Sequence, residues 1–315
     1  MQKLKKCNTL ALETNEPFNF KFSVWKPSHF PTRLESLAGD SLYRTIRLGS
    51  GDAVGLKLTA LEKKPGIKVD VYSKKPLDNC QLADLEKRLR WSYGLDESVV
   101  EFYEKYGCDT VLKNSIEKLY GMRNSCAENL FEILCIALVL QNTNVKRSQT
   151  MLENLLKNFG EELHFDGQAL YAFFTPASIL KSDEAQLKAE CRVGYRAKYL
   201  LSIAGAFNNG FNNVDFTKLN YDDAKNQLIE IKGVGDYSAS IALSSYLKDY
   251  SHVIIDSWSQ KIFSKVLNKN FKSRDNVVNA LKKRWDKYAG LAVLYVIENL
   301  YFTGKVNQRG LVEQS

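Results

Sequence analysis

Apolar and polar residues alternate along much of the first quarter of the chain. Turns rich in Gly, Pro, Asp and Lys separate the alternating stretches, which cover residues 17–25, 42–48, 53–61 and 67–72. A period of two bounded by such turns is typical of β-strands that bury one face. We therefore expect an antiparallel sheet with one solvent-exposed face over residues 17–74.

The apolar period changes from Gln81 onward. Leu82, Leu85 and Leu89 lie three and four residues apart, which is the spacing of one helix face. Similar patterns predict amphipathic helices over residues 111–160, 179–209, 216–248, 256–268 and 274–303. The expected fold is α+β, with a β-rich N-terminal domain over residues 1–80 and an α-helical domain over residues 81–315.

Composition sets the broad class of protein. The 315 residues are 44% hydrophobic and 25% charged, which is typical of a globular chain and excludes a disordered or collagen-like one. The 44 basic and 36 acidic residues leave a net charge of +8. A surplus of this size fits either a soluble surface or a face that follows phosphates, and both interpretations remain open.

The six cysteines are scattered and form no Cys-x-x-Cys pair. This pattern favours a reduced, intracellular protein, without the spacing of an iron–sulfur cluster or a zinc site. The first twenty residues have no apolar signal core, and no apolar run is long enough to cross a membrane. We expect a cytoplasmic (nucleoid) or nuclear protein that is neither secreted nor membrane-bound.

A glycine-rich turn separates two helical stretches near residue 234. Gly233-Val234-Gly235 predicts a helix-hairpin-helix at about residues 225–247. Glycines allow close backbone approach, and the N–H groups at the start of the second helix suit an anion such as phosphate. The same residues also fit a helix corner that only requires small side chains.

Asp256 lies nineteen residues after Tyr237, between an apolar run at residues 253–255 and a helical stretch at residues 260–267. One interpretation is an ordinary helix N-cap. The other is a carboxylate at the mouth of a cleft, opposite the hairpin.

Four segments of the chain resemble the helix-hairpin-helix DNA glycosylase superfamily. Their order and spacing match that superfamily from about residue 110 to residue 302. GYRAKY at residues 194–199 is similar to a segment of 8-oxoguanine DNA glycosylases. LQNTNVKR at residues 140–147 is similar to the loop that those enzymes insert into the duplex, and YAGLA at residues 288–292 resembles their last core helix. The fourth segment is the hairpin followed by Asp256. The 3-methyladenine DNA glycosylases belong to the same superfamily.

The resemblance implies an activity. Members bend the duplex, extrude one nucleotide and cleave its N-glycosidic bond, with double-stranded DNA as the partner. Asp256 matches the aspartate that stabilises the positive charge developing on the sugar. A monomer is expected, with no required cofactor and no iron–sulfur cluster.

The residue two positions after the second glycine divides the superfamily. Bifunctional members carry a lysine there, which attacks C1′ and forms a Schiff base. This chain has Tyr237, which cannot form an imine and favours a monofunctional enzyme that uses water. The alternatives are a bifunctional 8-oxoguanine glycosylase/AP lyase with another amine, or a non-catalytic damage-binding protein.

The resemblance also implies contacts with DNA. The side chains expected to fill the gap left by the extruded base are Gln141 and Asn142, with Tyr195 as a wedge beside them. Arg147 and Arg196 match arginines that read the orphaned base.

The hairpin residues Gly233, Val234 and Gly235 are expected to bind a DNA phosphate through their backbone. The carbonyls of Ile229, Ile231 and Val234 match a site for an alkali cation (Na or K).

The expected lesion pocket is lined by Tyr237, Ile241, Trp258, Val293 and Ile297, with Trp25 and Tyr295 as further aromatic candidates. Val293 and Ile297 align with a phenylalanine and a glutamine that grip the base in 8-oxoguanine enzymes. An aromatic pocket instead suits a cationic alkylated purine by cation–π stacking. The sequence therefore leaves two substrates open, an alkylated purine or 8-oxoguanine.

Overall fold

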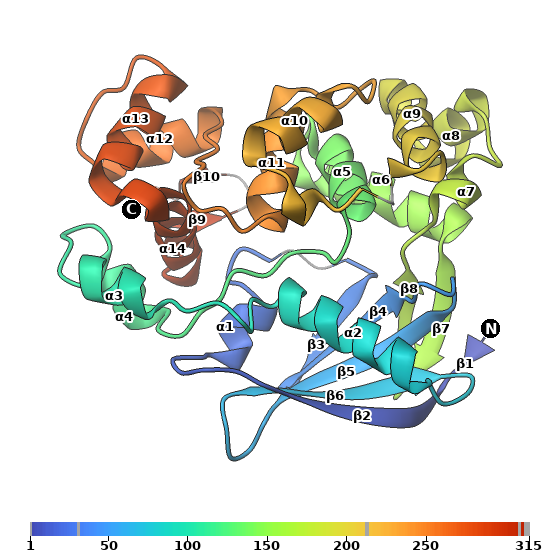
Figure 1. The fold of residues 1–315 in the computed structure, drawn as a ribbon. Coiled ribbons are helices and arrows are strands. Elements are labelled where there is room, and N and C mark those ends of the chain that lie inside the picture. Colours follow the sequence, from blue (N-terminus) through green and yellow to red (C-terminus); the bar gives the residue numbers. More distant parts are fainter. Residues whose placement is uncertain (1, 30–31, 212–213, 308–309, 312–315) are drawn as a thin grey trace.

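A five-stranded antiparallel sheet lies below a layer of helices in the computed structural model, which describes residues 2–29, 32–211, 214–307 and 310–311 (Figure 1). The strand order is β2-β6-β5-β4-β3. The strands are β2 (Lys5–Glu13), β3 (Glu35–Ala38), β4 (Ser41–Arg47), β5 (Ala53–Ala60) and β6 (Gly66–Ser73). The expected antiparallel sheet is confirmed, and β2 and β3 add the two edge strands, which the alternation did not predict.

The strand expected over residues 17–25 is wrong, because this segment forms the short helix α1 (Phe20–Val24). The Asn19 side chain caps the helix by accepting a hydrogen bond from the Phe22 N–H at 3.1 Å. The adjacent residues Ser23 and Val24 are both buried, which a strand with one buried face does not allow. Five residues are too few for alternation to distinguish a strand from one helical turn.

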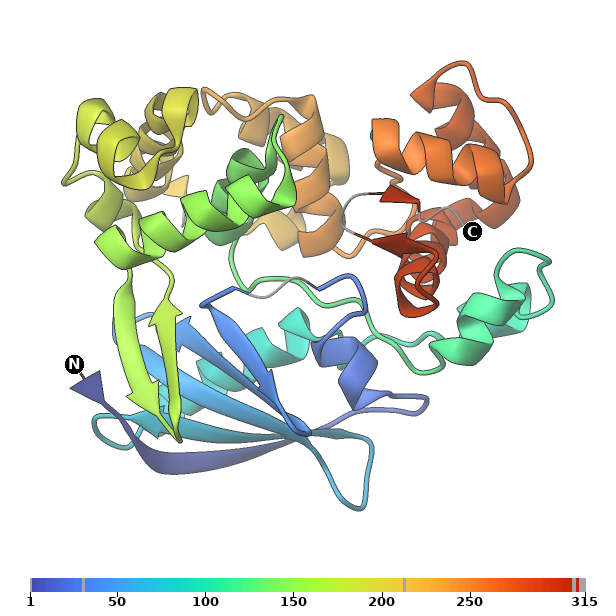
Figure 2. The same ribbon diagram turned by 180° about the vertical axis from the view of Figure 1, so that it is seen from behind.

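The expectation of one solvent-exposed sheet face is correct only in part. Helix α2 (Asn79–Ser92) packs on one face, and a hairpin of β7 (Glu161–Phe165) and β8 (Gln168–Ala172) reaches down from the helices to cover part of the other (Figure 2). The Phe165 ring fills the space over Gly55, where an added Cβ would lie 2.5 Å from it. Strand β1 (Gln2–Lys3) pairs in parallel with β7.

The packing of α2 bears on the expected division at residue 80. Leu85 and Leu89 of α2 share a core with Leu56 and Val71 of the sheet. The unit built around the sheet therefore continues past residue 80.

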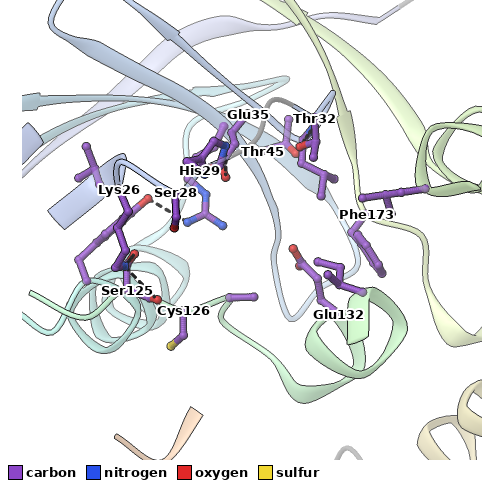
Figure 3. A pocket seen from close by; sticks show the side chains of 17 residues that line it. Lys26, Ser28, His29, Thr32, Glu35, Thr45, Ser125, Cys126, Glu132 and Phe173 are labelled. Carbon is purple, nitrogen blue, oxygen red and sulfur yellow. Dashed lines mark hydrogen bonds and ion pairs between the residues drawn. The ribbon is translucent and has the colours of Figure 1, made fainter. Parts of the chain in front are cut away.

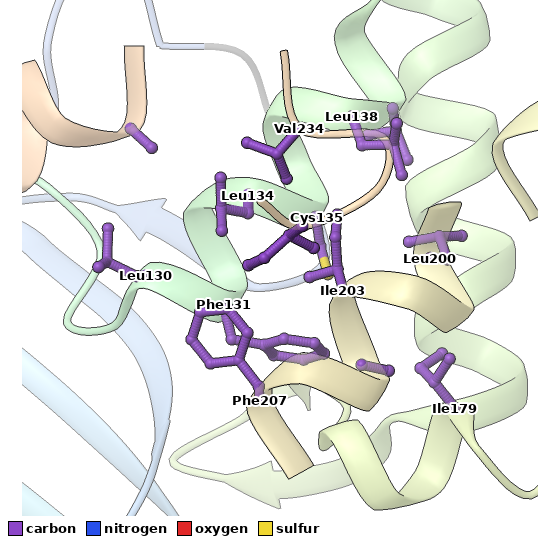
Figure 4. Packing of buried hydrophobic residues seen from close by; sticks show 14 of the residues in the cluster. Leu130, Phe131, Leu134, Cys135, Leu138, Ile179, Leu200, Ile203, Phe207 and Val234 are labelled. Atoms are coloured by element: carbon purple, nitrogen blue, oxygen red, sulfur yellow. The ribbon is translucent and has the colours of Figure 1, made fainter. Parts of the chain in front are cut away.

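The helical layer contains two separately packed cores. The first core joins α5, α6 and the helices around the hairpin, with Phe131, Leu134 and Ile203 near its centre (Figure 4). Its helices are α5 (Leu130–Leu140), α6 (Val145–Phe159), α7 (Pro176–Ile179), α8 (Glu184–Cys191), α9 (Ala197–Asn208), α10 (Tyr221–Ile229) and α11 (Asp236–Tyr246).

The second core surrounds the buried side chains of Phe102, Trp285 and Tyr295. Its helices are α3 (Val100–Tyr106), α4 (Lys113–Lys118), α12 (Ser257–Val266), α13 (Arg274–Trp285) and α14 (Ala289–Phe302). A two-stranded hairpin of β9 (Val306–Asn307) and β10 (Gly310–Leu311) follows α14. Within the described ranges, no helix is both long and apolar enough to cross a membrane.

Candidate active site

Asp256 is the N-cap of α12, and its carboxylate has a fixed orientation. Its Oδ1 accepts hydrogen bonds from the Ser259 N–H at 2.7 Å and from the Ser259 hydroxyl at 2.6 Å. The two interpretations of Asp256 as a cap and as a cleft residue are therefore compatible, because the capping contacts occupy one of its two oxygens.

Tyr237 lies in the first turn of α11 and faces Asp256. The Asp256 carboxylate is close enough to act on the Tyr237 hydroxyl. Burial, reinforced by this carboxylate, raises the pKa of Tyr237 to about 12. The phenol therefore remains neutral at physiological pH and acts as a hydrogen-bond donor. The side chain is still 41% exposed, so it lies at a surface that a ligand can reach.

A positive charge lies beside this pair. Arg274, the first residue of α13, acts electrostatically on Tyr237 and donates a hydrogen bond to the Ser257 hydroxyl at 2.7 Å. The sequence reasoning missed Arg274, because only the fold brings the start of α13 next to α12.

The two glycines of the hairpin have different roles. Gly233 has a φ of +100°, and a Cβ there would lie 2.5 Å from the Tyr199 ring, so the fold requires glycine at this position. Gly235 precedes α11 with open space around it. The bare N–H groups at the start of α11 therefore face solvent and suit an anion.

The expected lesion pocket is only partly assembled. A cavity of about 180 Å³ lies between α11, the chain leading to Asp256 and α14, and Val293 and Ile297 line it together with Ser245 and Ile254. Tyr237 and Ile241 do not line this cavity. Their helical spacing to Ser245 places them on the same face of α11.

The remaining aromatic candidates have separate positions. The ring centroids of Trp258 and Tyr301 lie 6.2 Å apart, so these two side chains form an aromatic pair between α12 and α14. Tyr295 is fully buried and donates its hydroxyl to the Met122 carbonyl, and Trp25 stacks on His29. The expectation that Tyr295 lines the pocket is therefore wrong, because its ring is part of the second core.

The loop between α5 and α6 exposes some of the expected DNA contacts and hides others. Asn142 and Arg147 are exposed, and Tyr195 is 45% exposed. The Gln141 side chain instead donates to the Ser238 hydroxyl at 2.6 Å. Arg196 is only 3% exposed and hydrogen-bonds backbone carbonyls, so its guanidinium does not reach the surface where an orphaned base would lie.

The family model for HhH-GPD superfamily base excision DNA repair proteins matches residues 135–287, which include the hairpin and Asp256. These residues form an HhH-GPD domain. The expected superfamily is therefore confirmed.

Most of the chain, including the HhH-GPD domain, is similar to known DNA glycosylases. The DNA-3-methyladenine glycosylase of Bacillus subtilis (strain 168) is 24% identical over 252 residues, which are 78% of this chain and 82% of that protein. The structure of 3-methyladenine DNA-glycosylase from Archaeoglobus fulgidus has a TM-score of 0.78 and 20% identity, covering 93% of this chain and 98% of the other.

A DNA complex has the same fold as the HhH-GPD domain and its neighbours. It is the Clostridium acetobutylicum 8-oxoguanine glycosylase/lyase with double-stranded DNA containing cytosine opposite 8-oxoG, with a TM-score of 0.64 and 18% identity. It covers 86% of this chain and 98% of that one. At these identities the solved structures show a shared fold.

The alkali-cation site at the hairpin of the HhH-GPD domain stays a prediction. The Ile231 carbonyl accepts a hydrogen bond from the Val234 N–H at 2.9 Å, which leaves its second lone pair available. Within the part of the chain that the structure describes, no cluster of His, Cys, Asp and Glu side chains is arranged to hold a metal ion.

A larger cavity that the sequence did not predict lies where the HhH-GPD domain meets the sheet. It has a volume of about 350 Å³, with Glu132 and Phe173 on one side and Lys26 and Ser28 on the other (Figure 3). Burial and the nearby Glu128 raise the pKa of Glu132 to about 8, and burial lowers the pKa of Lys26 to about 8. Periodicity places Glu132 on a helix but does not show that it lines a cavity.

Proposed function

We propose that this protein is a monofunctional DNA glycosylase that hydrolyses the N-glycosidic bond of a damaged purine in duplex DNA. The HhH-GPD domain and the named relatives support a glycosylase. The observation that carries the proposal is the proximity of the Tyr237 hydroxyl to the Asp256 carboxylate, which reinforces burial in raising the pKa of this tyrosine. It supports a phenol, which forms no imine, beside the acid at the position where bifunctional members have a lysine.

The geometry suggests how the bond would break. As the base departs, positive charge develops on the sugar, and the Asp256 carboxylate stabilises it. Ser259 holds that carboxylate by two hydrogen bonds and fixes its direction, and the Tyr237 hydroxyl lies close to it. A water molecule then adds to C1′, because Tyr237 supplies no amine.

Two separate features, the aromatic side chains near Asp256 and the apolar cavity lined by Val293 and Ile297, favour an alkylated purine as the substrate. Tyr237 and the Trp258–Tyr301 pair offer electron-rich rings near Asp256, which attract a cationic base. Val293 and Ile297 present apolar surface and no amide that would hydrogen-bond a neutral oxidised base. The buried position of Arg196 removes one of the two arginines that favoured 8-oxoguanine.

The phosphate backbone would bind at the hairpin and near Arg274. The start of α11 presents N–H groups next to Gly235, and the Arg274 guanidinium lies beside the Tyr237–Asp256 pair. These contacts would hold the strand on both sides of an everted nucleotide, with its sugar facing Asp256.

The test is an excision assay on duplexes that carry 3-methyladenine, hypoxanthine, uracil or 8-oxoguanine, each opposite different bases. We expect release of the alkylated purine, an intact abasic strand and no covalent adduct with borohydride. Tyr237→Lys serves as a positive control for trapping, because it restores an amine beside Asp256.

Two results would contradict the proposal. An adduct with the unmodified protein would establish the bifunctional alternative. Tight binding of damaged DNA without release of any base, unchanged in Asp256→Asn, would establish a damage-binding protein instead.

A further inference from the structure

The chain leaves α5 at a corner formed by Gln141 and Asn142, which the buried Arg196 holds in place. The Arg196 Nε donates to the Leu138 carbonyl at 3.0 Å, and its terminal nitrogen donates to the Gln141 carbonyl. The guanidinium carbon also lies 4.6 Å from the centroid of the Tyr195 ring. The Leu138 carbonyl already accepts the Gln141 N–H at 3.3 Å, so Arg196 adds a second donor there and also satisfies the Gln141 carbonyl just beyond the helix. Arg196 thereby fixes the direction of the departing chain.

Two further hydrogen bonds fasten the same corner to other helices. The Gln141 amide donates to the Ser238 hydroxyl at 2.6 Å, and Ser238 directly follows Tyr237 in α11. On the α6 side, the Ser148 hydroxyl donates to the Val139 carbonyl at 2.9 Å. The corner is therefore bonded to the Arg196 turn, to α6 and to the helix that carries Tyr237.

Asn142 projects from this fastened corner. It is exposed and has a φ of +47°, a left-handed conformation that asparagine tolerates better than most residues. Neither Gln141 nor Arg196 is free to enter a duplex, since their polar groups are bonded to protein. Asn142 is thus the outward-facing polar side chain between Gln141 and α6 that we expect to enter the duplex, close in sequence to the exposed Leu140.

We propose that Arg196 and the Gln141–Ser238 pair are positioning residues that hold Asn142 at a fixed place relative to Tyr237. The side chain that fills the gap in the duplex and the one that faces the everted nucleotide then belong to one rigid unit. This inference rests on the proposed function. It reassigns Arg196 from reading the orphaned base to shaping the loop.

A rigid corner matters only when a base must leave a stacked duplex. Insertion of Asn142 compensates for lost stacking, and a loop already in the inserting conformation loses less entropy on binding. A lesion in single-stranded DNA has no stacked partner strand to replace, so its excision needs the Tyr237–Asp256 site but not the corner.

The experiment compares single-turnover excision of the same lesion in a paired duplex and in a single strand. Arg196→Lys loses the forked contact with two carbonyls, and Ser238→Ala removes the acceptor for Gln141. We expect each variant to lose about tenfold or more on the duplex and little on the single strand, as misplacement of a positioning group does. The preference for the base opposite the lesion should not change.

Arg123→Lys is the matched control. Arg123 is a buried arginine that also donates to backbone carbonyls, those of Glu97, Asn15 and Pro17, none of which belongs to the corner. Its replacement should lower the melting temperature without separating the two substrates.

Equal losses on duplex and single strand for Arg196→Lys and Ser238→Ala would overturn the positioning role, and so would a changed opposite-base preference. The fluorescence of 2-aminopurine next to the lesion reports eversion without turnover, so it tests the corner independently of catalysis. If the unmodified protein everts the lesion but excises nothing, the proposed function fails while the corner is still judged by the eversion signal.

Discussion

Ser259 donates both its N–H and its hydroxyl to a single oxygen of Asp256, at 2.7 and 2.6 Å. The same serine hydroxyl accepts the Asp256 N–H at 2.8 Å, which completes a capping box at the start of α12. The capping box, which in other proteins commonly begins a helix, here also orients the Asp256 carboxylate of the candidate site.

Asp256→Asn should therefore abolish most excision, with a loss of about 10²–10³-fold or more, because the developing positive charge loses its counter-charge. Ser259→Ala should lose less, since a hydrogen bond to a charged group is worth about 1.5–3 kcal/mol. Single-turnover rates measure both effects. Ser178→Ala is the control for capping, because Ser178 has the same position in the capping box of α7. Equal rates for Ser259→Ala and Ser178→Ala would contradict the orienting role.

The ionisation of Tyr237 gives a second prediction. Its pKa is raised to about 12, first by burial and then by the Asp256 carboxylate. Labelled tyrosine carbons observed by NMR should show that Tyr237 does not ionise below about pH 11, whereas exposed tyrosines titrate near 10. In Asp256→Asn the midpoint should fall, because the negative charge that opposes phenolate formation is gone. An unchanged midpoint would mean that the two side chains do not interact.

The two hairpin glycines should respond differently to alanine. Gly233→Ala places a Cβ against the Tyr199 ring at a φ of +100°, and it should destabilise the fold by about 1–3 kcal/mol. Gly235→Ala has open space, so its stability should stay within about 0.5 kcal/mol of the unmodified protein. DNA affinity measured by fluorescence anisotropy should nevertheless fall in Gly235→Ala, because its methyl group stands between the bare amides and a phosphate. Undiminished affinity would exclude the start of α11 from the DNA contact.

The partly buried Glu132 predicts an unusual dependence of stability on pH. Its pKa is raised from 4.5 to about 8, so between these values the folded state holds a proton that the unfolded state has released. Stability should therefore fall as the pH rises from about 4.5 to 8. Glu132→Gln should melt at a higher temperature than the unmodified protein at pH 9 and at a similar temperature at pH 4. Glu117→Gln, an exposed glutamate on α4, should show no such difference.

The sequence was most informative where a local pattern decides the structure. Alternation predicted β4, β5 and β6, and the Gly-Val-Gly turn placed the hairpin within residues 225–247. The turn between β7 and β8 carries Asp166-Gly167, both with positive φ, which is a hairpin signal that the sequence reasoning overlooked.

Tertiary packing decided the rest. The second face of the sheet carries Tyr43 and Tyr72, whose polar hydroxyls are typical of residues on a solvent-exposed face. In the fold, the Phe165 ring packs against both tyrosine rings and covers them. Arg196 and Tyr195 are neighbours in one segment, yet one is buried and the other exposed. Spacing alone cannot separate such residues, because burial depends on chain segments that lie far away in sequence.

Tyr237 and Asp256 lie on opposite sides of the boundary between the two helical cores. Tyr237 extends from α11, whose buried residues belong to the first core, while Asp256 follows Val253 and Ile255 of the second. The gap between phenol and acid is therefore set by how two independently packed bodies rest on each other. Under the proposed function, substitutions where the two cores meet would change which bases fit between Tyr237 and Asp256 while leaving both side chains intact.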